Sequence, residues 1–190
     1  GGDIGRLAVS GTVNDLAMMG ATEPLALTCS AILEDGFPRD VLERVWGSIR
    51  AACEEAGTTV VTGDTKVVPK GAVDKIFINT SGVGVLFDGV DVASKNATPG
   101  DVIILSGTIA DHGVTILANR EGLRFDVGVK SDSAPLNHLT RSMFESSRRI
   151  HVLRDPTRGG VGTALNEVAD KSNVGIKINE TDIPLRKEVV

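Results

Sequence analysis

Segments with the pattern of β-strands alternate with segments with the pattern of helices along this chain. An apolar helical segment opens it, and an apolar run, a second helix and the β-branched runs "TTVVTGDTKVV" and "KIFINTSGVGVLF" follow. Strand-like and helix-like segments alternate again beyond the "ATPGD" stretch at 97–101. The alternation predicts an α/β fold of two units joined near residues 88–100, the second incomplete at its C-terminal end.

The spacing of apolar residues predicts the individual elements. Gly57 is the expected stop of the second helix. Helices are expected over 4–19, 37–57, 111–122, 135–146 and 161–172. Strands are expected over 24–33, 58–68, 75–87, 102–107 and 174–185.

Composition narrows the class of protein. The 190 residues are 41% hydrophobic and carry a formal charge of −5, with one Trp and no Tyr. These values argue against a non-specific nucleic-acid binder, and no apolar run reaches the roughly 18 residues of a membrane span. Cys29 and Cys53 lack CxxC spacing, so we interpret them as reduced core thiols of a cytoplasmic protein; a disulfide is the alternative.

An acid interrupts the apolar helix "SGTVNDLAMMGAT". At about 100° per residue, Asp15 falls on the same side as Ile4, Leu7 and Met18, and the opposite side is also apolar. A buried carboxylate is costly unless a cation or a hydrogen bond meets it. The alternative is a half-exposed acid at a helix bend, paired with Arg6 or another base.

Two more acids stand in comparable settings. Asp64 follows a glycine that interrupts a strand, and Asp155 precedes a helix. Gly159-Gly160 leaves backbone N–H groups free at the start of that helix, which suits a phosphate. Acids that converge on a divalent ion, with a basic side chain nearby, are what a Mg-nucleotide site needs.

The candidate bases are Lys66 and Arg158. Three of the candidates also have a plain structural interpretation: Asp64 as the cap of a turn, Asp155 as a turn residue and Lys66 as a solvated side chain. The chain contains no GxxxxGK[ST] or GxSxG motif and no Cys/His cluster for zinc. Spacing alone therefore predicts no more than a phosphate and metal site.

Four stretches together carry a family resemblance: "GGDIGRLAVSGTVNDLAMMGA", "VVTGDTKVV", "DHG" and "RDPTRGGVGTALNEVA". They are similar to the PurM-like superfamily of aminoimidazole ribonucleotide (AIR) synthetase. Within it, "GDTKVV" and "DPTRGG" resemble the HypE family of hydrogenase maturation factors, the carbamoyl dehydratases. The resemblance runs over essentially the whole chain, in the same order.

The resemblance implies a two-domain PurM-like fold. Its N-terminal domain, here 1–88, would dimerise through its β-sheet; a linker (89–100) and a C-terminal α/β domain (101–190) would follow. ATP and Mg²⁺ would lie in the cleft between the domains. The implied reaction is ATP-dependent dehydration of an S-carboxamide on a C-terminal cysteine to a thiocyanate. ATP would phosphorylate the carboxamide oxygen, and the cyano group would become a ligand of [NiFe] hydrogenase iron. The implied partners are a carbamoyltransferase and the scaffold proteins of hydrogenase maturation.

The resemblance also implies roles for individual residues. Lys66 and Asp64 would be catalytic, with Lys66 acting on the phosphoryl group or carrying a proton. The metal ligands would be Asp15, Asp64 and Asp155. Cofactor-binding residues would be Gly1, Gly2, Asp3, Asn14, Asp15, Thr65, Arg158, Gly159 and Gly160.

The chain departs from the family pattern at both ends. It starts Gly-Gly-Asp rather than with Met, lacks the family's acidic N-terminal segment, and has no cysteine after Cys53. We therefore expect a fragment with weak or no ATP turnover. The alternatives are another PurM-like enzyme, making selenophosphate or an aminoimidazole nucleotide, and a non-catalytic binding or dimerisation module.

Overall fold

Strand β1 (Ala21–Glu34) is the centre of a three-stranded sheet in the order β2-β1-β3. Helix α2 (Arg39–Ala56) connects it to β2 (Val60–Val68), which pairs with β1 in parallel. Strand β3 (Ile76–Leu86) pairs with β1 in the antiparallel sense. A parallel neighbour requires a long crossover, and α2 provides it. The three strands predicted for this half of the chain are confirmed.

The computed structural model describes residues 3–122, 130–187 and 189. The described residues form two compact units. The sheet unit comprises Asp3–Val90 and Ser133–Arg148, and the helical unit comprises the described residues of 91–132 and 149–190. The segment 133–148 therefore packs with the N-terminal residues, while the domain boundaries expected at 88 and 101 stay a prediction.

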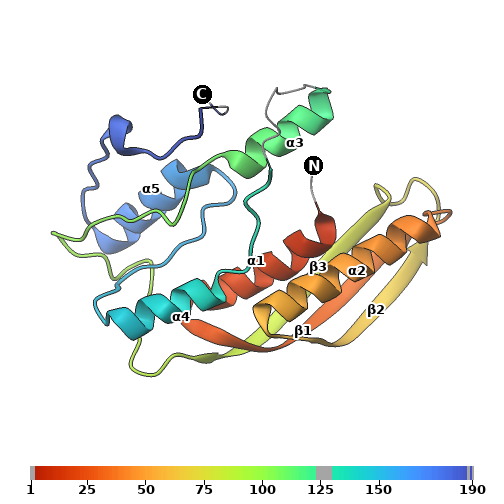
Figure 1. Cartoon of the computed structure of the whole chain (residues 1–190), viewed down its shortest axis with the longest axis horizontal. Coiled ribbons are helices and arrows are strands. Elements are labelled where there is room, and N and C mark those ends of the chain that lie inside the picture. Colours follow the sequence, from red (N-terminus) through yellow and green to blue (C-terminus); the bar gives the residue numbers. More distant parts are fainter. Residues whose placement is uncertain (1–2, 123–129, 188, 190) are drawn as a thin grey trace. The chain divides into compact units, whose positions relative to one another are not determined.

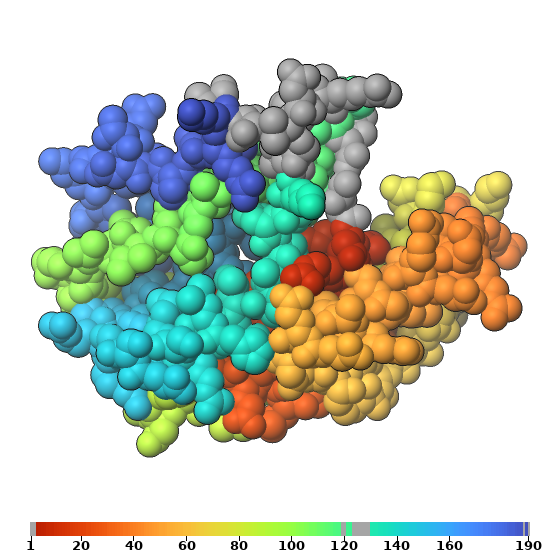
Figure 2. Space-filling model, viewed as in Figure 1, coloured from red at the N-terminus to blue at the C-terminus, as the bar shows by residue number. Residues whose placement is uncertain are grey.

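Helices α1 (Ile4–Met18) and α2 cover one face of the sheet, its inner face (Figure 1). In the space-filling view, side chains of α2 in orange and of α4 in cyan lie over this face of the unit (Figure 2). Gly57 ends α2 in the left-handed conformation, as predicted. The core between helices and sheet consists of Val9, Val13, Leu27, Cys29, Val45, Ile49, Ala52, Cys53 and Ala56.

The buried side of α1 is the one opposite Asp15. Gly5, Val9, Val13 and Ala17 are buried, and Asp15 is exposed. Arg6 pairs instead with Glu55 of α2, at 2.6 Å between Nη1 and Oε2. The expectation of an acid on an apolar, buried side was wrong, because α1 turns its small and β-branched residues to the core.

Helix α4 (Asn137–Ser146) completes the sheet unit. Phe144 is buried, and its ring lies 5.6 Å from that of Phe87, just beyond β3. The guanidinium of Arg148 lies 4.8 Å from the centre of the Phe87 ring, a cation–π distance. These contacts hold residues 57 and 61 positions further along the sequence against the end of the sheet.

The helical unit contains α3 (Asp111–Glu121), α5 (Gly160–Ser172) and the short 3-10 helix η1 (Glu180–Asp182). The helices predicted here are confirmed, but the strands predicted over 102–107 and 174–185 are wrong. Val102 and Ile104 are each 82% exposed. β-Branched runs form strands only beside a partner strand, and within the described part of this unit there is none.

Among the described residues, none of the helices combines the length and apolarity needed to cross a membrane.

Candidate functional site

Strand β2 contains an irregularity that decides where its motif residues point. Leu27 pairs with Val60, but the next residue of β1, Thr28, pairs with Thr62, so one residue of β2 is extra. An extra residue reverses the alternation of side chains beyond it. Val60 packs against the core, and from Thr62 onward the even-numbered residues point to the other face of the sheet.

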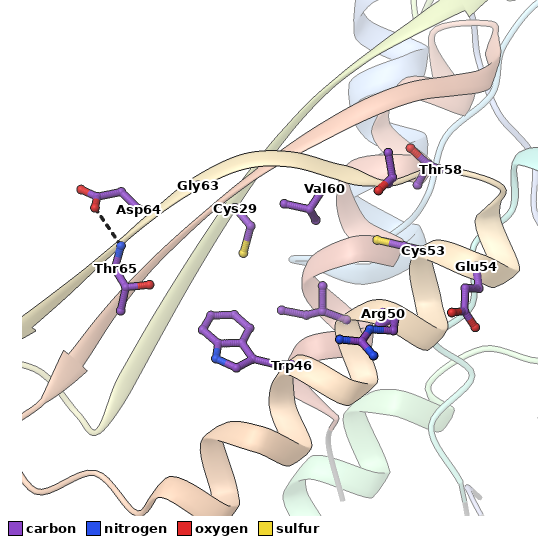
Figure 3. A pocket seen from close by; sticks show the side chains of 12 residues that line it. Cys29, Trp46, Arg50, Cys53, Glu54, Thr58, Val60, Gly63, Asp64 and Thr65 are labelled. Carbon is purple, nitrogen blue, oxygen red and sulfur yellow. Dashed lines mark hydrogen bonds between the residues drawn. The ribbon is translucent and has the colours of Figure 1, made fainter.

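Asp64 and Lys66 therefore lie on the face opposite α1 and α2, which we call the outer face. Asp64 is level with Ser30 of β1 and, beyond it, Asn79 of β3. Lys66 is level with Ile32 and Phe77 in the same way. Figure 3 shows the Asp64 carboxylate pointing away from Trp46 of α2, and one of its oxygens accepts a hydrogen bond from the Thr65 N–H at 2.9 Å. Both side chains are exposed.

The remaining predicted residues of the sheet unit lie on α1. Asp15 is exposed, and within the described part of the chain its carboxylate has no hydrogen-bond or ion-pair partner. Asp3 is the N-cap of α1, where its carboxylate accepts from the Arg6 N–H at 3.0 Å and from the Ser48 hydroxyl. This cap satisfies one free N–H of the helix start.

Asn14 has both ends of its amide engaged with the α4 segment. Its Nδ2 donates to the Ala134 carbonyl at 3.0 Å, and its Oδ1 accepts from the Leu136 N–H at 2.7 Å. These bonds satisfy backbone groups just before α4. Asn14 therefore positions α4, a role that sequence reasoning did not assign to it.

The sheet unit brings together Asp3, Asn14 and Asp15 on one helix, and Asp64, Thr65 and Lys66 on one strand, but it does not join the two sets. Asp15 is on a helix of the inner face and Asp64 on the outer face. In the described part of the chain, no group of three or more His, Cys, Asp or Glu side chains is placed to hold a metal ion.

In the helical unit, Gly159 and Gly160 begin α5 as predicted. Gly159 is the N-cap, with φ 78°, and no side chain caps the helix. A Cβ at Gly159 would lie 2.2 Å from the Thr163 hydroxyl, so this turn requires glycine. Uncapped N–H groups at a helix start, beside the exposed Arg158, form an arrangement that suits a phosphate. Asp155, partly buried, lies five residues before α5.

Sequence reasoning missed a buried acid in the "DHG" stretch. Asp111 is fully buried and lies 2.9 Å from Nε of Arg186 and 2.6 Å from the Thr108 hydroxyl. The neighbouring His112 has its Nδ1 2.9 Å from the Ser131 hydroxyl. A buried acid is retained when a cation and hydrogen bonds meet it, and nothing in the sequence near Asp111 points to a partner 75 residues away.

The two cysteines confirm the interpretation as core thiols. Both are buried and unbonded to each other. Burial raises the pKa of the Cys29 thiol and also that of Cys53, for which nearby Cys29 adds to the effect. They are therefore neutral near pH 7. Gly1 and Gly2 lie outside the described residues.

Comparison with known proteins places this geometry in a family. The N-terminal domain model of the AIR synthase related proteins matches residues 1–86, and the C-terminal domain model matches residues 98–190. The carbamoyl dehydratase HypE of Rhizobium leguminosarum bv. viciae is 50% identical over 190 residues. That match covers all of this chain and 54% of the relative, so the chain spans about half the length of such relatives.

Solved structures give the same result. A HypE structure in complex with ATP has a TM-score of 0.96 and 52% identity, covering all of this chain and 56% of that one. A HypE–HypF complex has a TM-score of 0.96 and 53% identity, covering all of this chain and 62% of that one. The chain belongs to the AIR synthase related protein family and is similar over its whole length to the carbamoyl dehydratases named HypE.

Proposed function

We propose that this chain is the nucleotide-binding part of a carbamoyl dehydratase that makes the cyano ligands of [NiFe] hydrogenase iron. The observation that carries the proposal is the similarity of the whole chain to HypE proteins, one of them solved with ATP. High similarity to selenophosphate synthetases or aminoimidazole ribonucleotide synthetases would favour the alternative enzymes. The relatives described above are instead named HypE.

The proposed reaction converts a protein-bound S-carboxamide to a thiocyanate. In balance, R–S–C(=O)–NH₂ and ATP give R–S–C≡N, ADP and phosphate, so the water removed from the amide ends in the phosphate. The amide oxygen leaves with the phosphoryl group, and both amide protons go to bases or water. Such a reaction depends on positioning and charge stabilisation rather than on a protein nucleophile.

The donor chemistry of this chain fits Mg-ATP. Mg²⁺ takes hard oxygen ligands, usually one or two carboxylates together with phosphate oxygens, and it would neutralise charge on the phosphates. Asp15 and Asp64 offer exposed carboxylates that no basic side chain of the described residues pairs with. Asp155 is a third carboxylate. The start of α5, with Gly159, Gly160 and Arg158, offers N–H groups and a guanidinium to phosphate oxygens.

A single copy of the sheet unit cannot bring Asp15 and Asp64 to one metal, since the sheet separates them. We therefore propose a homodimer in which Asp15 of one copy and Asp64 of the other meet at a shared site. The outer face supports this assignment because it presents apolar side chains, among them Leu25, Phe77 and Val83, each more than half exposed. Exposed apolar surface of this kind marks an interaction site.

Lys66 would serve the same site from the outer face. It shares that face with Asp64, two residues away along the strand, at a spacing of about 7 Å. The ammonium would stabilise charge on the transferring phosphoryl group or remove an amide proton. Within the described part of the chain Lys66 has no carboxylate partner, which leaves its charge available.

For partners, a solved HypE–HypF complex supports an interaction of the whole protein with a carbamoyltransferase. We extend the proposal to the scaffold proteins of hydrogenase maturation and to a cytoplasmic location. The two free thiols fit a reducing compartment.

Calorimetric titration of the 190-residue chain with ATP, with and without Mg²⁺, tests the nucleotide part of the proposal. We expect saturable, Mg²⁺-dependent binding that Asp15→Asn weakens at least about tenfold, as the loss of a metal-binding charge does. Binding of partner proteins without any ATP binding would instead support a non-catalytic module.

A second assay tests the substrate. A peptide ending in S-carboxamide cysteine is supplied with Mg-ATP, and mass spectrometry follows the loss of one water. Phosphate release that depends on selenide and not on the peptide would favour a selenophosphate synthetase. Weak turnover is expected because the reacting cysteine is supplied in trans.

A further inference from the structure

We infer that the cavity between α2 and strands β1 and β2 binds a small planar molecule with one anionic group, an aromatic carboxylate. The cavity lies on the inner side of the sheet. Gly63, Asp64 and Thr65 of β2 also line it, but the carboxylate of Asp64 and the side chain of Lys66 point to the outer face. Its ligand is therefore separate from the nucleotide of the proposed function, and the inference does not depend on that function.

The cavity has the size and walls of a small-molecule site. Its volume is about 560 Å³, within the usual range for ligand pockets. Trp46, Ile49 and Val60 form apolar walls, and the thiols of Cys29 and Cys53 enter it from β1 and α2 (Figure 3). An indole and two polarizable sulfurs favour contact with a flat, apolar ring.

One polar group in the wall has no partner. Thr58 lines the cavity, and its hydroxyl oxygen is buried without a hydrogen bond among the described residues. Buried hydroxyl groups are nearly always hydrogen-bonded, so an occupant of the cavity, either water or a ligand, would meet this one. Thr58 lies apart from the Arg50 guanidinium (Figure 3), so this polar contact is separate from the one made by the anionic group.

The charges around the cavity favour an anion. The Arg50 guanidinium points toward Trp46 (Figure 3), and no acid of the described residues forms an ion pair with it. Glu54 extends away from Trp46, and the Asp64 carboxylate points to the outer face, where it accepts from the Thr65 N–H. Burial raises the pKa of both thiols. They carry no negative charge to compete with the ligand.

Trp46 is the single Trp of the chain, so its indole N–H gives one NMR signal at the cavity. The test titrates the 190-residue chain with 2-naphthoate and follows this signal. We expect a saturable shift, which Arg50→Gln weakens by roughly tenfold, the effect of one charged hydrogen bond. Arg44→Gln, on the same helix but outside the cavity, is the matched control and leaves the affinity unchanged.

One further measurement separates the site from non-specific apolar binding. The neutral isostere 2-naphthamide is expected to bind about tenfold more weakly than 2-naphthoate, because it lacks the charge that Arg50 meets. Thr58→Val, away from the Arg50 guanidinium, is expected to leave the unfolding midpoint unchanged or raised, because the buried hydroxyl that it removes has no partner among the described residues. Absence of a saturable shift, equal effects of the two arginine changes, or equal affinity for the amide would each overturn the inference.

Discussion

Val60 and Asp64 lie four residues apart in β2, yet their side chains point to opposite faces of the sheet. In a regular strand they would share a face. The extra residue opposite the Leu27–Thr28 step reverses the alternation between them. As a result Val60 joins the core, whereas Asp64 and Lys66 face away from α1 and from Asp15. The motif "GDTK" is thus presented on a surface that a second copy can reach.

Gly63 allows the close approach of β2 to β1 at this irregularity. A Cβ at Gly63 would lie 2.1 Å from the Cys29 carbonyl oxygen, and backbone cannot yield as a flexible side chain can. We expect Gly63→Ala to lower the free energy of unfolding by about 2 kcal/mol or more, measured by urea denaturation.

Gly47→Ala is the control for that change. Gly47 is exposed in α2, and a Cβ there meets nothing within 4 Å. Alanine is expected to raise the free energy of unfolding by about 0.5–1 kcal/mol. Equal effects of the two substitutions would show that Gly63 is not a close-packed position.

The pair of Arg6 with Glu55 makes stability depend on pH. The hydrogen bond that the Glu55 carboxylate accepts from the Arg6 side chain lowers the pKa of Glu55 from its ordinary 4.5. A carboxyl group whose pKa is lower in the folded state stabilises that state at pH values above its unfolded-state pKa. This stabilisation is lost as the pH falls through the folded-state pKa. Both side chains are partly exposed, so we expect Glu55→Gln to cost at most about 1 kcal/mol near pH 7, and less on acidification below pH 4.5.

Chemical denaturation of the parent chain and Glu55→Gln between pH 3 and 8 measures this difference. Glu43→Gln is the control, since Glu43 forms an exposed pair with Arg39 within α2, and such pairs contribute about 0.3–0.5 kcal/mol. A cost for Glu55→Gln that grows as pH falls would contradict the assignment.

The thiols of Cys29 and Cys53 should react slowly. Their raised pKa values keep them protonated, and the thiolate is the reactive form. We expect reaction with a disulfide reagent at pH 8 to be at least about tenfold slower in the folded chain than in urea, because both groups are also buried. Equal rates would mean that the core around them opens readily.

The outer face should mediate self-association. Phe77→Asp places a charge on its apolar surface and is expected to shift the chain toward monomer in sedimentation analysis. Val102→Asp is the control, because Val102 is an exposed apolar residue of the helical unit. A dimer that survives Phe77→Asp and dissociates with Val102→Asp would place the interface elsewhere.

The helices and the three strands of the sheet unit could be predicted because their apolar spacing is long and regular. The side of the sheet to which Asp64 points could not be predicted. One extra residue in β2 reverses it, and no residue type in the strand marks the position of that irregularity. The sequence left open whether Asp15 is buried or exposed, for a related reason. Small residues such as Gly5 and Ala17 line the buried side of α1, and apolarity alone does not separate them from Met18 on the other side.

Candidate site residues were predictable one motif at a time but not as an arrangement. Glycines at the start of α5 are a local signal, and the structure places them as expected. Asn14 binds backbone 120 residues away, and Asp111 meets Arg186 75 residues away. Residues so distant in the sequence produce no local pattern, so the spacing of residue types does not predict these polar contacts.

A complementation experiment tests the shared site most directly. Asp15→Asn and Asp64→Asn chains are titrated with Mg-ATP, alone and after mixing in equal amounts with dimer exchange. Each variant alone is expected to lose binding, and the mixture to recover about one quarter of the parent sites, since half of the dimers are mixed and each has one intact site. No recovery in the mixture, although the dimers exchange, would contradict a site built from Asp15 of one copy and Asp64 of the other.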